Sequence, residues 1–152
     1  MAPTNRTTKP TAASPPARTL VIDNGAYTIK AGFSSPDPTI PATPSIIPNC
    51  LARDRDRKVY IGSDLSKCKD FGEIVFRRPV EKGYLVNWEA EKEIWEHEFF
   101  DPKATQYCDP KETGLILTEA PNGLPALQTN CDQMIFEEYG FARYLRTPGR
   151  KP

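Results

Sequence analysis

The chain has 152 residues, a net charge of zero, 38% hydrophobic residues and a mean hydropathy of -0.56, values that suit one rather polar domain. No apolar run approaches the roughly 20 residues that span a bilayer, and the N-terminus lacks the apolar core of a secretory signal, so we expect an intracellular protein without a membrane segment. The four cysteines form no C-x-x-C pair and there is one histidine, which argues against a zinc site and a disulfide framework and favours buried, reduced thiols.

The charges are unevenly distributed. Residues 1–18 contain three basic residues, no acidic ones and four prolines, and they are predicted to be a disordered leader. Residues 146–152 are predicted to be a disordered basic tail. Between these ends, residues 19–142 hold 13 basic and 20 acidic residues. Dispersed basic side chains at the ends of a chain are usually solvated, and contact with nucleic acid is the alternative. No motif for sequence-specific recognition of nucleic acid is present.

The first predicted element is a hairpin over residues 19–33. Two apolar strands, 19–23 and 27–33, meet at Asn24-Gly25, a pair typical of a two-residue turn with positive φ at both positions. Gly25 would let backbone amides approach an anion, Asp23 could hold the water shell of Mg²⁺, and Lys30 would add positive charge. A plain turn without a ligand is the alternative, since any short connection favours Asn-Gly.

Residues 34–75 are predicted to be an irregular outer subdomain. Five prolines in residues 34–48 favour an extended surface connection. Residues 53–58 alternate basic and acidic side chains, which indicates an exposed loop, and a short strand should follow at 59–62.

Residues 88–100 are predicted to be a helix with Asn87 as its N-cap, ended by Asp101-Pro102. Its large apolar residues fall on one stripe, which should face the core: Trp88, Ile94, Trp95 and Phe99. His97 lies among acidic residues on the polar side and is predicted to be a solvated surface residue.

The last elements are a buried strand at 115–118 and a helix at 131–139. The strand should pair parallel to strand 19–23, because the intervening residues allow a long crossover. Asn130 resembles the N-cap of the helix and Gly140 suits its C-terminal cap. The apolar segment that follows stops after a few residues, so the fold is expected to be incomplete.

Five motifs in this order resemble signatures of the actin superfamily, and together they extend over most of residues 19–145. They are Leu20-Val-Ile-Asp-Asn-Gly25 with Lys30-Ala-Gly-Phe33, Pro44-Ser45-Ile46, Gly83 to Trp88, Ile94-Trp95, and Leu117-Thr-Glu-Ala-Pro121. Four segments, two of which overlap these motifs, are similar to nuclear actin-related proteins of the sixth class: Asn24 to Tyr27, Ile47 to Cys50, Lys82 to Trp88, and Phe136 to Tyr139.

The resemblance implies an α/β fold, an actin-like (ribonuclease-H-like) mixed sheet with helices. We expect strands near 19–23, 27–33, 59–61 and 115–118 in this sheet. Residues 19–145 would be the N-terminal portion of the domain, and residues 34–75 its outer subdomain.

The resemblance also implies a nucleotide site with ATP and Mg²⁺ as the cofactor. Asp23 would orient water on the Mg²⁺, the amides of Asn24, Gly25 and Ala26 would contact phosphate, and Lys30 would neutralise it. Actins have a small hydroxyl residue and a glycine where this chain has Ala26 and Tyr27, so one hydrogen bond to phosphate is lost and bulk is added. A second phosphate loop is not found in these residues, which leaves half a site.

The functional expectation is an interaction subunit rather than an enzyme. The sixth-class resemblance implies a structural subunit of a nuclear ATP-dependent chromatin-remodelling complex that exchanges a variant histone into nucleosomes. Its partners would be the other subunits and, through them, histones, in the nucleus, with the cytoplasm as a second location. The alternatives are a nucleotide-binding actin-type ATPase, a cytoskeletal protein, and a truncated product without independent activity. The segment 53–58 is shorter than the actin loop that reaches the next subunit, which argues against polymerisation.

Overall fold

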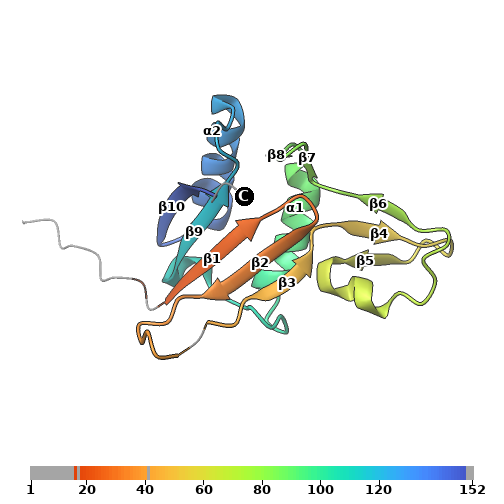
Figure 1. The fold of residues 1–152 in the computed structure, drawn as a ribbon, viewed down its shortest axis with the longest axis horizontal. Coiled ribbons are helices and arrows are strands. Elements are labelled where there is room, and N and C mark those ends of the chain that lie inside the picture. The colour runs from red at the N-terminus through yellow and green to blue at the C-terminus, as the bar shows by residue number, and fades with distance from the viewer. Residues whose placement is uncertain (1–15, 17, 41, 150–152) are drawn as a thin grey trace, which may run out of the picture.

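The computed structural model describes residue 16, residues 18–40 and residues 42–149. A five-stranded sheet in the order β10-β9-β1-β2-β3 forms its centre (Figure 1). Its strands are β1 (Arg18–Asn24), β2 (Thr28–Phe33), β3 (Ser45–Pro48), β9 (Thr113–Glu119) and β10 (Arg143–Pro148). The first strand thus begins at Arg18, the last residue of the expected leader, whose residues 1–15 and 17 lie outside the described residues.

The sheet is mixed, as the sequence predicted. β1 and β2 are antiparallel, with Asp23 opposite Lys30. β9 pairs parallel to β1, and β10 pairs parallel to β9. The parallel pairing of 115–118 with the first strand is therefore confirmed, and the crossover that it requires contains helix α1 (Trp88–Trp95). The expected α/β class, a mixed sheet with helices, is confirmed with it.

A second, antiparallel sheet lies beside the first, in the order β5-β4-β6 (Figure 1). Its strands are β4 (Leu51–Arg53), β5 (Val59–Ile61) and β6 (Val75–Arg77). The expectation that 59–61 joins the main sheet is wrong, because Leu51 rather than a residue of the hairpin pairs with Ile61. Much of the segment expected to be irregular therefore has regular structure, including a 3-10 helix, Gly62–Lys67.

The charged segment between β4 and β5 is a tight turn. Asp54 accepts the amide hydrogen of Lys58 on its side chain at 2.9 Å, and Arg57 has a φ of 65°. After β6, a short hairpin of β7 (Val80–Glu81) and β8 (Tyr84–Leu85) leads into α1. His97, expected to be solvated, is half-buried with Nε2 3.3 Å from Asp64 Oδ2.

The first helix has the predicted extent. Asn87 caps α1 by accepting the amide hydrogen of Ala90 at 3.1 Å, and the helix continues as a π-helical segment, Glu96–Phe100. The second helix, α2 (Pro125–Gln133), starts six residues earlier than predicted and continues through a π-helical segment, Met134–Tyr139. Its first residue is a proline, which needs no N–H donor there, so Asn130 is not the cap. Gly140, at φ 66°, ends it as predicted.

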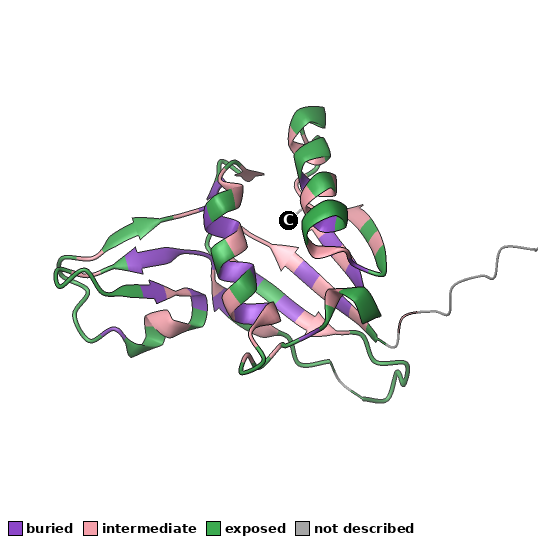
Figure 2. Cartoon of the chain, turned by 180° about the vertical axis from the view of Figure 1, so that it is seen from behind, coloured by how far each residue is buried: buried purple, intermediate pink, exposed green. Residues whose placement is uncertain are grey.

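Both helices pack on the same face of the five-stranded sheet (Figure 2). Trp95 and Phe99 are fully buried there, between the sheet and the segment that follows α2. The four cysteines are buried and unpaired, as expected. On the opposite face of the sheet, Ile46 and Leu145 are exposed. Within the described residues, no helix is long and apolar enough to cross a bilayer.

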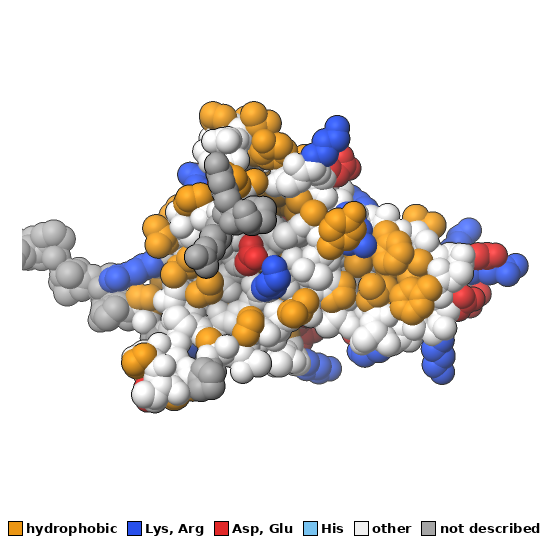
Figure 3. Space-filling model, in the orientation of Figure 1, with side chains coloured by type: hydrophobic (Ala, Val, Ile, Leu, Met, Phe, Trp, Pro, Cys, Tyr) orange, Lys and Arg blue, Asp and Glu red, His pale blue; other side chains and the backbone are white. Residues whose placement is uncertain are grey.

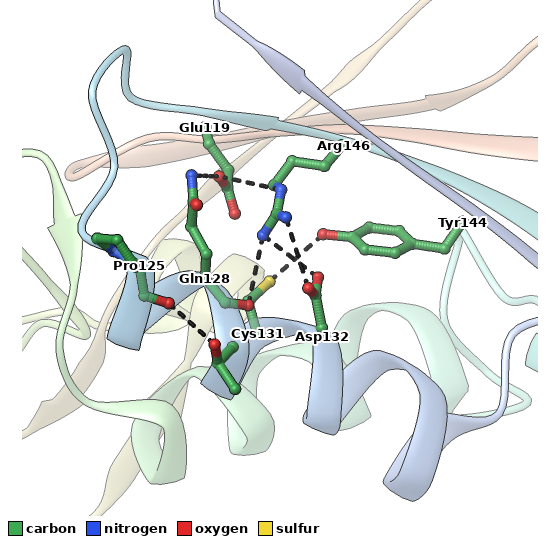
Figure 4. Close-up of polar contacts among 8 residues, drawn as sticks. Glu119, Pro125, Gln128, Cys131, Asp132, Tyr144 and Arg146 are labelled. Atoms are coloured by element: carbon green, nitrogen blue, oxygen red, sulfur yellow. Dashed lines mark hydrogen bonds and ion pairs between the residues drawn. The ribbon is translucent and has the colours of Figure 1, made fainter.

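Strand β10 includes Arg146, Thr147 and Pro148, which were expected in a disordered tail. Backbone pairing with β9 and the side-chain contacts of Arg146 hold this segment in a strand (Figure 4). The Arg146 guanidinium lies 3.3 Å from Asp132 Oδ1 on α2 and 3.6 Å from Glu119 Oε2 at the end of β9. The expected tail boundary at 146 is therefore wrong, and residues 150–152 lie outside the described residues.

Candidate phosphate-binding site

The loop between β1 and β2 differs from the predicted two-residue turn. The last ladder pair is Asn24 with Ile29, so four residues, 25–28, separate the last paired residues of the hairpin, and the Gly25 amide donates to Thr28 O at 3.1 Å. Neither Asn24 nor Gly25 has a positive φ. A glycine is required here for another reason: a Cβ on Gly25 would lie 2.7 Å from Thr28 O.

The predicted acid and amine lie on the same side of the sheet. Lys30 Nζ is 3.3 Å from Asp23 Oδ2, and both side chains are about half exposed. Asp23 Oδ1 accepts a hydrogen bond from the Thr118 hydroxyl at 2.6 Å. That bond, with a smaller contribution from Lys30, holds the pKa of Asp23 below its usual value. Thr118 was not predicted, although the parallel register places it directly beside Asp23.

The backbone of the loop offers two amides to a ligand. The N–H groups of Ala26 and Tyr27 have no hydrogen-bond partner in the described part of the chain, whereas that of Gly25 is used by Thr28. The Asn24 side chain turns inward and bonds to Glu91. Of the predicted phosphate contacts, the structure therefore brings Ala26 and Lys30 together with Asp23 at one end of the sheet.

This donor set fits a phosphate held from one side. Lys30 supplies an ammonium group, and the two amides supply directed N–H donors. Both oxygens of Asp23 already have a protein partner, so a Mg²⁺ ion would meet it through water, as this ion usually does. No group of three or more metal-binding side chains exists among the described residues.

Tyr27 adds bulk at the tip of the loop, as the sequence indicated. Its side chain is 72% exposed, and the Arg78 guanidinium lies 4.7 Å from the ring centroid. The same guanidinium lies 5.3 Å from the ring centroid of Phe76 on β6. The loop and the outer sheet thus share a surface layer of two aromatic rings and one cation.

A buried polar cluster lies beneath the loop. Asn49 Nδ2 donates to Gly25 O at 2.9 Å and to Glu91 Oε2 at 3.3 Å, and the Trp95 indole donates to Glu91 Oε1 at 2.7 Å. Glu91 and Asn49 are both fully buried. Sequence analysis missed this cluster, because an acidic residue in an amphipathic helix is normally solvated.

A small cavity adjoins the loop between the β7–β8 hairpin, the end of β9 and α2. Its volume is about 60 Å³, and its lining includes Asn24, Trp88 and Gln128. Ligand pockets usually measure about 300 to 1,000 Å³, so this cavity suits water rather than a nucleotide. The buried Trp88 Nε1 and Asn24 Oδ1, which lack protein partners, provide polar groups for such water.

Comparison with known proteins shows which family and which relatives this chain is similar to. The family model described as Actin matches residues 14–148. "Actin-related protein 6" of Neurospora crassa is 68% identical over 136 residues, which cover 90% of this chain and 30% of that protein. "Actin-like protein arp6" of Aspergillus fumigatus is 49% identical over 152 residues, covering 92% of this chain and 32% of that protein. "Actin-like protein ARP6" of Cryptococcus neoformans is 47% identical over 135 residues, covering 88% and 26%. The chain thus spans about a third of the length of these relatives.

Proposed function

This chain belongs to the actin family and, within it, to the actin-related proteins of the sixth class, and on that premise we propose that it is a structural and interaction subunit. The assembly would be a nuclear ATP-dependent chromatin-remodelling complex that exchanges a variant histone into nucleosomes. Its direct partners would be other subunits, and it would meet histones through them. This role follows from the class resemblance, and two properties of the molecule support it.

The first property is the weakness of Asp23 as a base. It is the one carboxylate at the candidate phosphate site in the described structure, and it is engaged by both Thr118 and Lys30. Its pKa lies below the usual value, whereas a general base works best with a pKa near the working pH. This arrangement supports a binding role, and we propose that the chain itself is not an enzyme.

The second property, which carries the proposal, is the exposed layer formed by Tyr27, Phe76 and Arg78, called here the aromatic patch. Hydrophobic side chains gather over β4, β6 and the tip of the β1–β2 hairpin (Figure 3). Aromatic rings and arginine are the residue types most enriched at the centres of protein interfaces. The patch is therefore suited to contact another subunit.

A pull-down from nuclear extract tests the proposal. The immobilised chain should recover subunits of a histone-exchanging remodelling complex, identified by mass spectrometry. The double variant Tyr27→Ser/Phe76→Ser should lose most of this recovery. Phe71→Ser is the matched control, since Phe71 is 56% exposed but outside the patch. A folded chain that recovers no remodelling subunit would contradict the proposed role.

A nucleotide-binding, actin-type ATPase is the second candidate, and the Asp23–Lys30 pair with the two available amides favours it. A phosphate gripped from one side gains only part of the contacts of a closed cleft, so we expect weak binding. Calorimetric titration of the chain with ATP and Mg²⁺ measures it. Lys30→Gln should remove any heat, and Lys58→Gln, an equivalent change distant from the loop, should not. Absence of heat from the unchanged chain would eliminate this candidate for these residues.

A further inference from the structure

Glu91 is a fully buried carboxyl group whose hydrogen-bond partners are all neutral. Its oxygens accept hydrogen bonds from Trp95, Asn49 and Asn24. No lysine, arginine or histidine in the described structure forms an ion pair with it. An ionised carboxylate without a cation is strongly unfavourable in such a place, whereas the protonated form is tolerated.

The hydrogen-bond donors and acceptors around Glu91 also favour its protonated form. The Asn49 amide, which donates to it, has a buried oxygen without a partner, Oδ1. The cluster is therefore short of donors, not of acceptors. A carboxylate would add acceptor capacity only, while a carboxylic acid brings one O–H donor.

The cluster also holds the loop. Asn49 bonds two loop carbonyls, with Nδ2 donating to Gly25 O and its backbone N–H donating to Tyr27 O, each at 2.9 Å. The same Nδ2 donates to Glu91. A change at Glu91 therefore acts on the loop through one shared side chain.

We infer that Glu91 is held as a neutral carboxylic acid in the folded chain and, through Asn49 and Asn24, positions the loop of residues 25–28, so that ionisation of Glu91 loosens this loop. An ionised Glu91 would attract water and the Asn49 amide, at the expense of the bond to Gly25. The inference concerns the loop itself and does not depend on the proposed remodelling role. If the loop binds phosphate, its affinity would fall as Glu91 ionises.

The remaining charged and titratable groups near the cluster do not replace a counter-ion. These groups come from the elements packed around Glu91. Arg78 donates a hydrogen bond to Asn49 O, Cys50 is a buried thiol, and Tyr139 stacks on Trp95. Lys30 pairs with Asp23, and Lys92 pairs with Glu138. Burial raises the pKa of Glu91 to about 7, against the opposing effect of its three hydrogen bonds. Ionisation thus falls in the neutral range.

Two measurements on the 152-residue chain test the inference. Carbon-13 NMR of the glutamate carboxyl groups should show Glu91 titrating within about one unit of pH 7. Hydrogen exchange of the loop, corrected for the intrinsic pH dependence, should show roughly tenfold or greater loss of protection between about pH 6 and pH 8.5.

Variants at Glu91 and Glu93 test whether ionisation of Glu91 causes the loss of loop protection. Glu91→Gln keeps the shape and remains neutral, so its loop protection should not change over this range. Glu93→Gln should behave as the unchanged chain. A Glu91 carboxyl that titrates near pH 4.5 would overturn the inference, as would a Glu91→Gln chain that loses protection like the unchanged one. If Glu91→Gln fails to fold, the NMR titration of the unchanged chain still decides. A pull-down that recovers no remodelling subunit would contradict the proposed function, but it would not change the results expected from the NMR titration and from hydrogen exchange.

Discussion

At the scale of single residues, Gly25 shows that a residue type can be predicted correctly for the wrong reason. The sequence suggested a positive φ, but the structure requires a glycine because the backbone of Thr28 approaches too closely. A steric requirement of this kind is not relieved by a change of rotamer, since the obstacle is a backbone carbonyl.

Gly25→Ala should therefore destabilise the chain. A methyl group 2.7 Å from Thr28 O forces the loop to shift, at a cost of about 1 to 3 kcal/mol. Urea unfolding measures the difference. Gly32→Ala is the control, because the added methyl would have its nearest contact 3.5 Å away, at Pro44 Cα. Equal midpoints for Gly25→Ala and the unchanged chain would show that the loop accommodates the methyl.

At the scale of elements, the segment from Trp88 to Phe100 anchors the core. Trp95 packs edge-to-face against Trp88 and Phe99 and stacks on Tyr139, with a centroid distance of 5.9 Å to the last. One side chain thus links the first helix, the sheet and the segment after α2.

Trp95→Ala should lower the free energy of unfolding by about 3 to 5 kcal/mol, since it empties a large, fully buried site and removes a hydrogen bond to Glu91. The urea midpoint would report it. Glu93→Ala on the exposed side of the same helix should change little. An unaltered midpoint in the tryptophan variant would show that this face of the helix does not stabilise the chain.

The elements that sequence reasoning found are those with a strong local signal. The hairpin strands, the helix at 88–100 and the strand at 115–118 have clear periodicity or apolar runs. The sheet of β4, β5 and β6 was missed because each strand has three residues and gains its partners only through tertiary pairing. The start of α2 was missed because Asn130 looks like a cap, while Pro125 needs no capping side chain.

The candidate site was predicted in part, for a similar reason. Asp23 and Lys30 are seven residues apart on adjacent strands, so a hairpin alone places them together. Thr118 and Asn49 come from distant parts of the chain, and only the folded sheet brings them to the loop. The burial of Glu91 is a property of the whole core and has no local signature.

At the scale of the whole molecule, groups with opposite pKa shifts should give the stability a maximum in mildly acid solution. The pKa values of Asp23 and Asp64 are lowered from 3.8, chiefly by hydrogen bonds from Thr118 and Lys67, so their stabilising effect is lost as the pH falls through those lowered values. The pKa of Glu91 is raised from 4.5 to about 7, so its contribution is complete below 4.5 and is lost as the pH rises through 7.

Urea unfolding at a series of pH values from about 3 to about 8.5 checks this prediction. The midpoint should be highest near about pH 4 to 4.5, should fall below that as the aspartates are protonated, and should fall progressively from about pH 4.5 to about pH 7 as Glu91 ionises. Glu91→Gln should abolish the decline on the neutral side and leave the acid side unchanged. A midpoint that keeps rising up to pH 8.5 would contradict the assignment.

The two borders of the main sheet differ in what they offer to another strand. On one side, β3 has four residues, ends at Pro48 and is preceded by Pro44, and neither proline has a backbone N–H to donate. On the other side, β10 has six residues with a single proline at its end, and within the described residues no strand pairs with it on the side away from β9. An additional strand, from a longer form of this polypeptide or from another molecule, would therefore extend the sheet along β10.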